Sequence, residues 1–392
     1  MNGRTAHAIK RPNFNPSPDP IRPMSSPSIE STPAEPALKP HTRILELDAL
    51  RALAAINLVL FHFTHVYSVK FGYSTPLGFE WPYGAYGVEM FFILSGFVNS
   101  MSLLRRGQPT DFVAARLIRI VPFFLIAIIA NLWILRLAPM YETVGSAQFL
   151  ANMTLVPRIL GYECVDPVMW TLQIEMMFYV TLVVMFKIGA LRRYFVGWGT
   201  LLALSLAVCP TLDSLAAIHG NSAWFGVATS LRRLMLLDFV PLFAIGFLLY
   251  MIKTGTGKRW QNIVGILIAA GVFHSIDHGK HNPAATALIV GLVTLSAYGK
   301  VPPLRLRPLV YVSTISYALY LCHNNLGCAL IHCLDQGGIP PQICFLIAVA
   351  FAFSLSIIVT NRIEAPMTRA LRGAWNRFRS SDTKKQPVTA AV

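Results

Sequence analysis

Residues 47–67, LDALRALAAINLVLFHFTHVY, form a mostly apolar stretch of about the 20 residues that a helix needs to cross the hydrocarbon core of a bilayer. Nine further stretches of this kind follow, near residues 84–104, 117–138, 170–187, 194–210, 234–252, 261–277, 283–299, 309–331 and 342–361. Lipid offers no partners for backbone N–H and C=O groups, so each stretch is expected to be a helix. The sequence therefore predicts an all-α, polytopic integral membrane protein with about ten transmembrane helices.

The composition of the whole chain agrees with this prediction. Of its 392 residues, 54% are hydrophobic and 13% are charged, and the mean hydropathy is +0.54. Soluble domains carry about 25% charged residues. These values exclude an ordinary soluble enzyme, a disordered protein and a disulfide-rich secreted domain.

Basic residues are concentrated in the connections between the apolar stretches. The chain has 33 Lys and Arg against 18 Asp and Glu, a net charge of +15. One set of alternate connections carries about twice as many basic residues as the other, and the positive-inside rule places this set and both termini in the cytoplasm. Such clustering is not that of a nucleic-acid-binding domain, so no nucleic acid is expected as a partner. Arg232 and Arg233 lie on the poorer side, where the alternative is that they line an outward-facing cavity.

The chain divides into a membrane domain and two tails. Residues 1–42 are rich in proline and polar residues, which predicts a disordered cytoplasmic tail, and they hold no apolar core of a cleaved signal. Residues 43–370 hold the apolar stretches and form the membrane domain. Residues 371–392 are polar and basic, so we expect a flexible cytoplasmic tail there.

Arg51 and His62 share one face of the first predicted helix. They are eleven residues apart, a rotation of about 1100°, which lies ~20° from three full turns with a rise of ~16 Å. Ionisable residues inside a membrane segment are candidates for function, because they need a partner or a water-filled cavity. The alternatives are that Arg51 extends to the interface as an anchor and that His62 is a buried histidine bonded to the backbone.

Four polar residues are expected at one level of the membrane, namely His62, Glu89, Glu175 and His323. A carboxylate bonded to one imidazole nitrogen fixes the tautomer of the ring and raises the basicity of the other nitrogen. Such a pair is equipped to take a proton from a hydroxyl group. Structural polar contacts between helices are the alternative.

Arg116 and Arg119 form a basic pair at the start of the third predicted helix. They are a candidate phosphate clamp for a cytosolic cofactor, or else ordinary positive-inside charge. Ser95 is a candidate nucleophile, although the adjacent Gly96 favours a close helix contact. The residues His274, Asp277, His278 and His281 have a helical spacing that zinc can use, but zinc sites usually have a stricter ligand shell, and no metal is expected.

The buried charges also fit a proton-coupled secondary transporter, in which His62 and Glu175 form a proton relay. That function predicts inverted repeats and helices broken by Gly or Pro. The sequence shows no clear repeat, and transport leaves the Arg116–Arg119 pair unexplained. Transport remains the alternative function.

Six motifs stand in order along the chain: ELDALRALAAINLVLFHF (46–63), GVEMFFILSGF (87–97), FVAARLIRIVPFF (112–124), WTLQIEMMFYV (170–180), ISYALYLCH (315–323) and IEAP (363–366). Together they resemble the membrane acyltransferase-3 family, which O-acylates extracytoplasmic glycans. The resemblance covers about residues 43 to 370. The departures are small residues or conservative changes that concern helix packing more than chemistry: Ala49, Ala52, Thr171 and Ala365. Since no periplasmic esterase-like domain follows, a single-domain member is implied.

The resemblance implies a fold of ten helices around a central cavity that reaches both faces of a membrane, expected to be a bacterial cytoplasmic membrane. It implies an O-acyltransferase that moves an acetyl or similar short acyl group from cytosolic acyl-CoA (acetyl-CoA) to a hydroxyl of an extracytoplasmic or lipid-linked polysaccharide. The expected partners are membrane lipid, acyl-CoA and the sugar acceptor. A small molecule or a lipid as acceptor is an alternative, and the choice between direct transfer and an acyl-enzyme stays open.

The resemblance also implies roles for individual residues. His62 would act as general base, and Glu175 would orient or polarise by bonding His62 or the sugar. The three arginines Arg51, Arg116 and Arg119 would bind the phosphates of acyl-CoA. Second-rank candidates for the site are Asp48, Glu89, Ser95, Tyr179 and His323.

Overall fold

The computed structural model describes residues 44–138, 140–141, 143–220 and 222–385, and these residues form helices and loops with no β-strand among them. The predicted all-α fold class is confirmed. The proline-rich tail predicted at 1–42 lies outside the described residues. In chain order the α-helices are α1 (Leu45–Phe61), α2 (Tyr67–Lys70), α3 (Gly84–Arg106), α4 (Pro109–Leu137), α5 (Ser146–Met153), α6 (Trp170–Lys187), α7 (Tyr194–His219), α8 (Ala223–Leu234), α9 (Val240–Thr254), α10 (Arg259–Ile276), α11 (Pro283–Ala297), α12 (Arg307–Cys322), α13 (Asn324–Gln336), α14 (Pro341–Val359) and α15 (Ala365–Lys385).

Short segments of other helix types join several of these helices. Two are π-helical, η1 (His62–Val66) between α1 and α2 and η5 (Thr360–Glu364) between α14 and α15. Three are 3₁₀ turns, η2 (Pro167–Met169), η3 (Ala190–Arg193) and η4 (Pro302–Arg305). Single π turns within long helices are frequent at functional sites, and η1 begins at His62.

Six helical segments of the described residues are long and apolar enough to cross a membrane: Leu45–Lys70, Gly84–Arg106, Pro109–Leu137, Pro167–Lys187, Ala190–Ala216 and Pro341–Ser381. α9 and α11 are apolar but shorter. The chain is therefore a polytopic integral membrane protein, and the total of about ten crossings remains a prediction.

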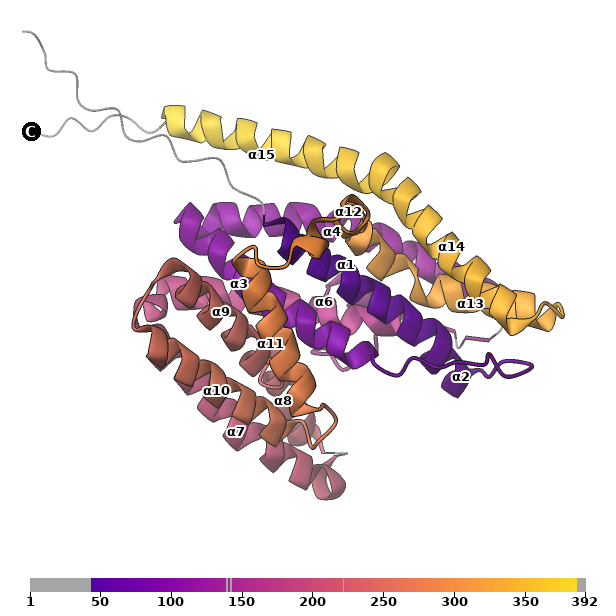
Figure 1. Ribbon diagram of the computed structural model, residues 1–392, viewed down its shortest axis with the longest axis horizontal. Helices are drawn as coiled ribbons and strands as arrows, with labels where there is room; N and C mark the ends of the chain where they lie inside the picture. Colours follow the sequence, from indigo (N-terminus) through magenta and orange to yellow (C-terminus); the bar gives the residue numbers. More distant parts are fainter. Residues whose placement is uncertain (1–43, 139, 142, 221, 386–392) are drawn as a thin grey trace, which may run out of the picture. The chain divides into compact units, whose positions relative to one another are not determined.

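α3 is at the centre of the helix packing. α3 lies between α1 and α9, and α10 and then α7 continue the layer beyond α9 (Figure 1). On its other side α1 contacts α12, which contacts α14. The crossing of α3 and α9 is very tight, because a Cβ atom at Gly96 or Gly246 would overlap the backbone of the other helix. Gly96 thus has the packing role that its position beside Ser95 favours.

The predicted crossing at 309–331 is wrong as a single helix. The chain bends at His323, where α12 ends and α13 begins. The buried carboxylate of Asp166 holds this bend, since it accepts hydrogen bonds from the side-chain amide of Asn324 at 2.8 Å and from the backbone N–H of Asn325 at 3.4 Å. The bend places His323 at the turn between the two helices.

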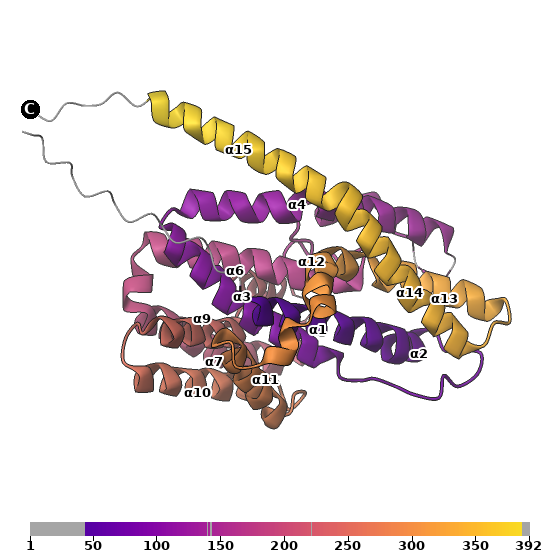
Figure 2. The ribbon, with the colours of Figure 1, turned by 45° about the horizontal axis from the view of Figure 1, so that its top comes forward.

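The C-terminal segment also differs from the prediction. Residues 371–385, expected to belong to a flexible tail, are helical and complete α15. α15 lies against α4 (Figure 2), and its Arg379 forms an ion pair with Asp111 at the start of that helix. The polar composition predicts an irregular tail, whereas this segment is helical and has an ion pair with α4.

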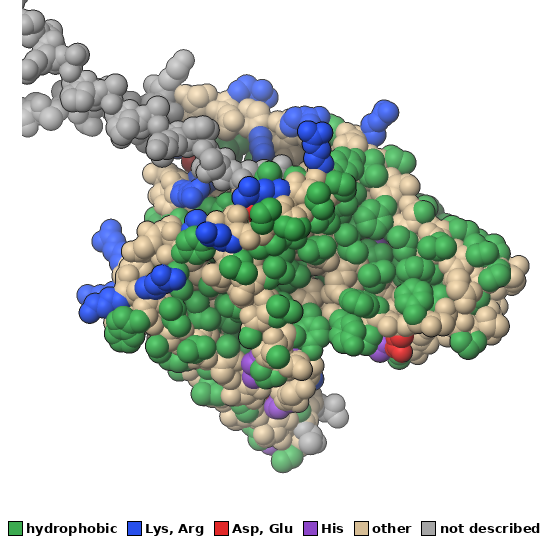
Figure 3. Space-filling model, in the orientation of Figure 1, with side chains coloured by type: hydrophobic (Ala, Val, Ile, Leu, Met, Phe, Trp, Pro, Cys, Tyr) green, Lys and Arg blue, Asp and Glu red, His purple; other side chains and the backbone are tan. Residues whose placement is uncertain are grey.

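The molecular surface has the character that lipid requires. Figure 3 shows apolar side chains over most of one face, while Lys and Arg gather toward the end where α1 begins and along α15. Large apolar side chains such as Trp133, Leu267 and Leu346 are more than half exposed, which suits a surface covered by acyl chains. The cytoplasmic location of the basic end remains a prediction.

Candidate active site

One small cavity gathers the three predicted arginines, and we call it the arginine cavity. It has a volume of about 110 Å³ and is lined by Arg51 of α1 and by Arg116 and Arg119 of α4. Glu175 and Tyr179 of α6 also line it, so the third and fourth of the six sequence motifs meet the first here. Three guanidinium groups around one carboxylate leave an excess of positive charge, which suits a polyanionic ligand.

Glu175 belongs to a polar network at the wall of the arginine cavity. Its Oε1 atom accepts hydrogen bonds from the hydroxyl groups of Tyr179 and, at 3.2 Å, of Ser95. Asn99 in turn donates to Ser95 Oγ at 2.7 Å. The expected bond between Glu175 and His62 does not form, because one turn of α6 and the facing turn of α3 supply closer partners. The candidate nucleophile Ser95 therefore donates a hydrogen bond from its hydroxyl to a carboxylate.

Aromatic rings and a single carboxylate contact the guanidinium groups of Arg116 and Arg51. The guanidinium of Arg116 lies 5.4 Å from the ring centre of Phe112 and 5.8 Å from that of Tyr179, and its buried Nε atom has no hydrogen-bond partner among the described residues. Arg51 contacts Asp48 at 3.5 Å one turn earlier on α1. Stacking on aromatic rings orients a guanidinium while leaving its N–H groups available to a ligand.

A second cavity, which we call the histidine cavity, lies beside the contact between His62 and His323. Its volume is about 330 Å³, and its lining includes His62. The Nε2 atom of the buried His323 lies 3.1 Å from Nδ1 of His62, and the two ring centres are 4.9 Å apart. The partner of His62 is thus a second histidine, where the sequence predicts a carboxylate.

Backbone carbonyls fix the tautomer of both rings. His62 Nδ1 lies 2.7 Å from the carbonyl oxygen of Leu58, and since that oxygen only accepts, Nδ1 carries the proton. His323 Nδ1 likewise donates to the carbonyls of Leu319 and Tyr320, at 2.9 and 3.0 Å, so His323 Nε2 accepts from His62. The lone pair of neutral His62 is then on Nε2, which has no hydrogen-bond partner among the described residues. That atom is the basic nitrogen of the site.

The arginine and histidine cavities adjoin. Both are lined by Leu58, Val88, Thr171 and Tyr320. The hydroxyl groups of Thr171 and Tyr320 are bonded to each other at this junction, and both also contact the carbonyl of Val168. Arg51 and His62, which helical spacing places on one face of α1, therefore face two hollows that share a wall.

Sequence reasoning missed the junction residues Val88 and Tyr320 as parts of the site. Both stand inside quoted motifs, GVEMFFILSGF and ISYALYLCH, which was the available signal. Thr171 stands out in the sequence only as a departure from the family motif. Their importance depends on three helices meeting at one point, which helical periodicity alone does not reveal.

Glu89 contacts neither His62 nor Glu175 and lines neither of their cavities, because its side chain points to another face of the bundle. Its side chain accepts a hydrogen bond from Thr286 of α11 at 2.9 Å, and its other oxygen lies 3.7 Å from Nε2 of His281. Depth along α3 can be read from the sequence, but the face on which a residue lies depends on the packing of α11. Glu89 instead lines a third cavity.

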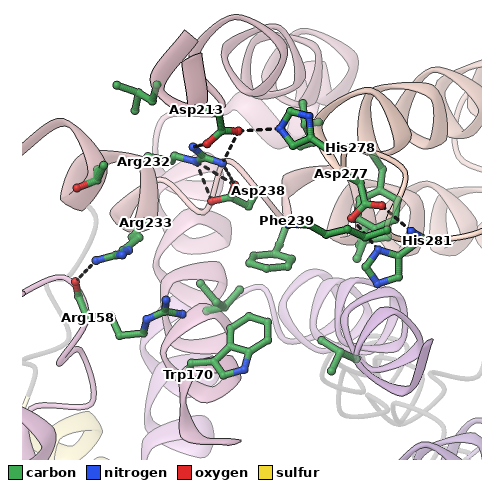
Figure 4. Close-up of a pocket in the computed structure, with 18 of the residues that line it drawn as sticks. Arg158, Trp170, Asp213, Arg232, Arg233, Asp238, Phe239, Asp277, His278 and His281 are labelled. Atoms are coloured by element: carbon green, nitrogen blue, oxygen red, sulfur yellow. Dashed lines mark hydrogen bonds and ion pairs between the residues drawn. The ribbon is translucent and has the colours of Figure 1, made fainter. Parts of the chain in front are cut away.

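The third and largest cavity has a volume of about 730 Å³, and we call it the tryptophan cavity after Trp170 (Figure 4). Arg232 and Arg233 line this cavity. The sequence offers the lining of a cavity as the alternative reason for these two basic residues on the poorer side of the membrane. It shares Ala85, Val88 and Trp170 with the histidine cavity. Burial alone lowers the pKa of Arg232, but hydrogen bonds to Asp238 and Asp213 raise it above the ordinary value.

Within the part of the chain that the structure describes, no group of three or more His, Cys, Asp or Glu side chains is arranged to hold a metal ion. The imidazole of His281 is paired with Asp277 at 2.6 Å, and that of His278 with Asp213 at 3.0 Å.

Comparison with known proteins agrees with the geometry. The sequence profile of the acyltransferase domain of acyltransferase family 3 matches residues 44–360. The chain is 24% identical to the membrane-bound transacylase BcsY of Komagataeibacter xylinus over 72% of this chain and 73% of that protein. It is 28% identical to the exopolysaccharide production protein ExoZ of Rhizobium meliloti, over 63% of this chain and 78% of that protein.

A third relative is longer than this chain. The O-acetyltransferase OatA of Staphylococcus aureus is 24% identical over 82% of this chain, and the matched part is 57% of that protein. None of these three relatives is named as a transporter. No solved structure matches the chain.

Proposed function

Since this chain belongs to the acyltransferase-3 family and is an acyl-transferring enzyme, we propose that it moves an acetyl or similar short acyl group from cytosolic acyl-CoA to a hydroxyl of an extracytoplasmic polysaccharide or lipid-linked sugar. The observation that carries the proposal is the junction of the two cavities, one lined by three arginines and the other by His62. Relatives named for exopolysaccharide production and O-acetyl transfer favour a sugar acceptor.

The arginine cavity is the proposed donor site. Arg51, Arg116 and Arg119 neutralise the phosphates of acyl-CoA through charge-assisted hydrogen bonds. The thioester then extends past Thr171 and Tyr320 toward the histidine cavity. Glu175 has a positioning role, since its carboxylate holds the hydroxyl groups of Tyr179 and Ser95 at the cavity wall.

His62 is the proposed general base. Its Nε2 atom takes the proton of the acceptor hydroxyl as the oxygen attacks the thioester carbonyl carbon. A C–O bond forms, the C–S bond breaks, and the released CoA thiolate takes up a proton. The bonds from His62 Nδ1 to Leu58 and His323 keep Nε2 directed into the cavity without a change of tautomer.

The test is acetyl transfer from acetyl-CoA to exopolysaccharide by the purified protein in nanodiscs. We expect His62→Gln to lower the rate on the order of 10²–10⁴-fold, the usual contribution of a general base. His65→Gln is the matched control, because His65 is paired with Glu80 and lines none of the three cavities. Equal rates for the His62 variant and the wild type would remove His62 from the mechanism.

The donor site has its own test. Arg116→Gln should raise KM for acetyl-CoA about tenfold, the loss expected for one charge-assisted hydrogen bond. Arg105→Gln is the control, since Arg105 is exposed at the end of α3. An unchanged KM in the Arg116 variant would contradict the assignment of the arginine cavity to acyl-CoA.

A further inference from the structure

The tryptophan cavity is the largest hollow described, and the proposed donor chemistry does not use it. It is formed by the start of α6, the end of α7, α8 and the loop between α10 and α11. Ala85, Val88 and Trp170 separate it from the histidine cavity and line both. A molecule bound there is therefore adjacent to the space that His62 faces.

Most charges on its wall already have partners. Arg232 binds Asp213 through Nη1 at 2.6 Å and Asp238 through Nε at 2.9 Å. His278 contacts Asp213, and His281 contacts Asp277 (Figure 4). These carboxylates each have a side-chain partner within the protein.

Arg158, Arg233 and Lys280 are the exceptions, and the two arginines are neighbours. Arg233 donates to the backbone carbonyl of Arg158 at 2.7 Å and has no carboxylate partner among the described residues. Arg158 Nε lies 3.8 Å from Glu163, an exposed residue, and this buried nitrogen has no hydrogen-bond partner. Burial, with Arg158 beside it, lowers the pKa of Arg233. Two neighbouring guanidinium groups that share one exposed carboxylate keep an excess of positive charge, which favours the binding of an anion.

Aromatic side chains flank this positive wall. In Figure 4 the side chain of Arg158 extends toward Trp170, and Arg233 lies on the same side of the cavity. The rings of Trp170 and Phe239 are 5.3 Å apart between centres and form an apolar floor. A cavity with an aromatic floor and a few directed polar groups is suited to a small ring-shaped ligand.

We propose that the tryptophan cavity binds an acidic sugar residue of the acceptor, with its anionic group on Arg158 and Arg233 and its ring on Trp170. This inference rests on the proposed function, because it gives the sugar acceptor a site next to His62. The anionic group is a carboxylate or a phosphate, since guanidinium groups bind both through paired N–H donors. The acceptor class is therefore an acidic saccharide.

The experiment measures binding apart from catalysis. Purified protein in phosphatidylcholine nanodiscs, which carry no net lipid charge, is titrated calorimetrically with cellobiouronic acid, with neutral cellobiose and with glucose 1-phosphate. We expect the wild type to bind an anionic sugar about tenfold more tightly than cellobiose. Preference for cellobiouronic acid identifies a carboxylate, and preference for glucose 1-phosphate identifies a phosphate such as that of a lipid-linked sugar.

Three variants make the result specific. Arg233→Gln should abolish the preference for the anionic sugar, and Arg233→Lys should retain part of it while controlling for misfolding. Arg136→Gln is the matched control, since Arg136 is exposed at the end of α4 and lines none of the three cavities. Equal binding of all three sugars, or a preference that survives Arg233→Gln, would overturn the inference.

Acetyl transfer is measured on the same samples, which separates the two proposals. Preferential binding without any acetyl transfer in the wild type would contradict the proposed function and leave the sugar site standing. Transfer to cellobiose and cellobiouronic acid with equal KM would leave the proposed function and overturn the acidic-sugar site.

Discussion

The Nε2 atom of His323 accepts a hydrogen bond from Nδ1 of His62 over 3.1 Å, across the bend between α12 and α13. The same Nδ1 atom contacts the carbonyl of Leu58. Both the Leu58 carbonyl and His323 Nε2 accept from Nδ1 of His62, and they leave Nε2 of His62 without a partner among the described residues. We propose that His323 is a positioning residue for His62.

The first prediction concerns His323. Replacing it by Leu removes the acceptor for His62 and should lower kcat about tenfold, the usual effect of one hydrogen bond on a transition state, with KM for acetyl-CoA unchanged. His323→Gln keeps an accepting oxygen and should recover part of the loss. A rise in KM with unchanged kcat would show that His323 does not act through His62.

The second prediction concerns Val88, which lines all three cavities. Val88→Trp should fill the junction, so that acyl-CoA still binds but acetyl transfer falls at least about 100-fold through the loss of reacting geometry. Val184→Trp is the matched control, because Val184 is 48% exposed on α6. Full transfer by the Val88 variant would mean that the acyl group takes another route.

The third prediction concerns the crossing of α3 and α9. A methyl group at Gly246 overlaps the carbonyl of Ile93, so Gly246→Ala should destabilise the protein by about 1–3 kcal/mol or more. Gly271 of α10 has no atom within 4 Å of an added Cβ, and Gly271→Ala should be neutral or stabilising. Thermal unfolding in detergent compares the two, and equal midpoints would count against this close contact.

The fourth prediction is a pH dependence at Asp166. Burial raises the pKa of this carboxyl from 3.8 to about 6, although hydrogen bonds from Asn324 and Val168 act in the opposite direction. Because the folded-state pKa is the higher one, the stabilisation from protonation is complete below about pH 4 and is lost as the pH rises through 6. Asp166→Asn retains an accepting oxygen and does not ionise.

The Tm of the Asp166→Asn variant, relative to wild type, should therefore be higher at pH 7 than at pH 5. Differential scanning calorimetry at pH 5, 6 and 7 measures this difference, and any other titrating group contributes equally to both proteins. A difference that stays constant over this range would contradict the raised pKa.

Helical spacing predicts the part of the site that one helix supplies. Arg51 and His62 share a face because α1 is unbroken between them, and Glu175 reaches Tyr179 because they are one turn apart on α6. The chemical roles of these residues remain predictions. The basic pair Arg116 and Arg119 can be predicted from the sequence alone, and the structure brings both to the arginine cavity.

Contacts between distant segments lie beyond such reasoning. The bend at His323 depends on Asp166, which stands 158 positions before Asn324 in the chain. The position of Glu89 along α3 can be read from the sequence. The direction of its side chain depends on the packing of α11, whose Thr286 donates to it. The same limit applies to the pairing of two histidines, since the partner of His62 comes from α12 and α13.

The most direct measurement is acetyl transfer across a sealed proteoliposome. Acetyl-CoA is supplied only outside, and a membrane-impermeant polysaccharide acceptor is trapped only inside. A path from the arginine cavity to His62 predicts acetylated acceptor in the lumen for the wild type and its loss for His62→Gln. Acetylation only when donor and acceptor share one compartment, or undiminished transfer by His62→Gln, would contradict a path through the two joined cavities.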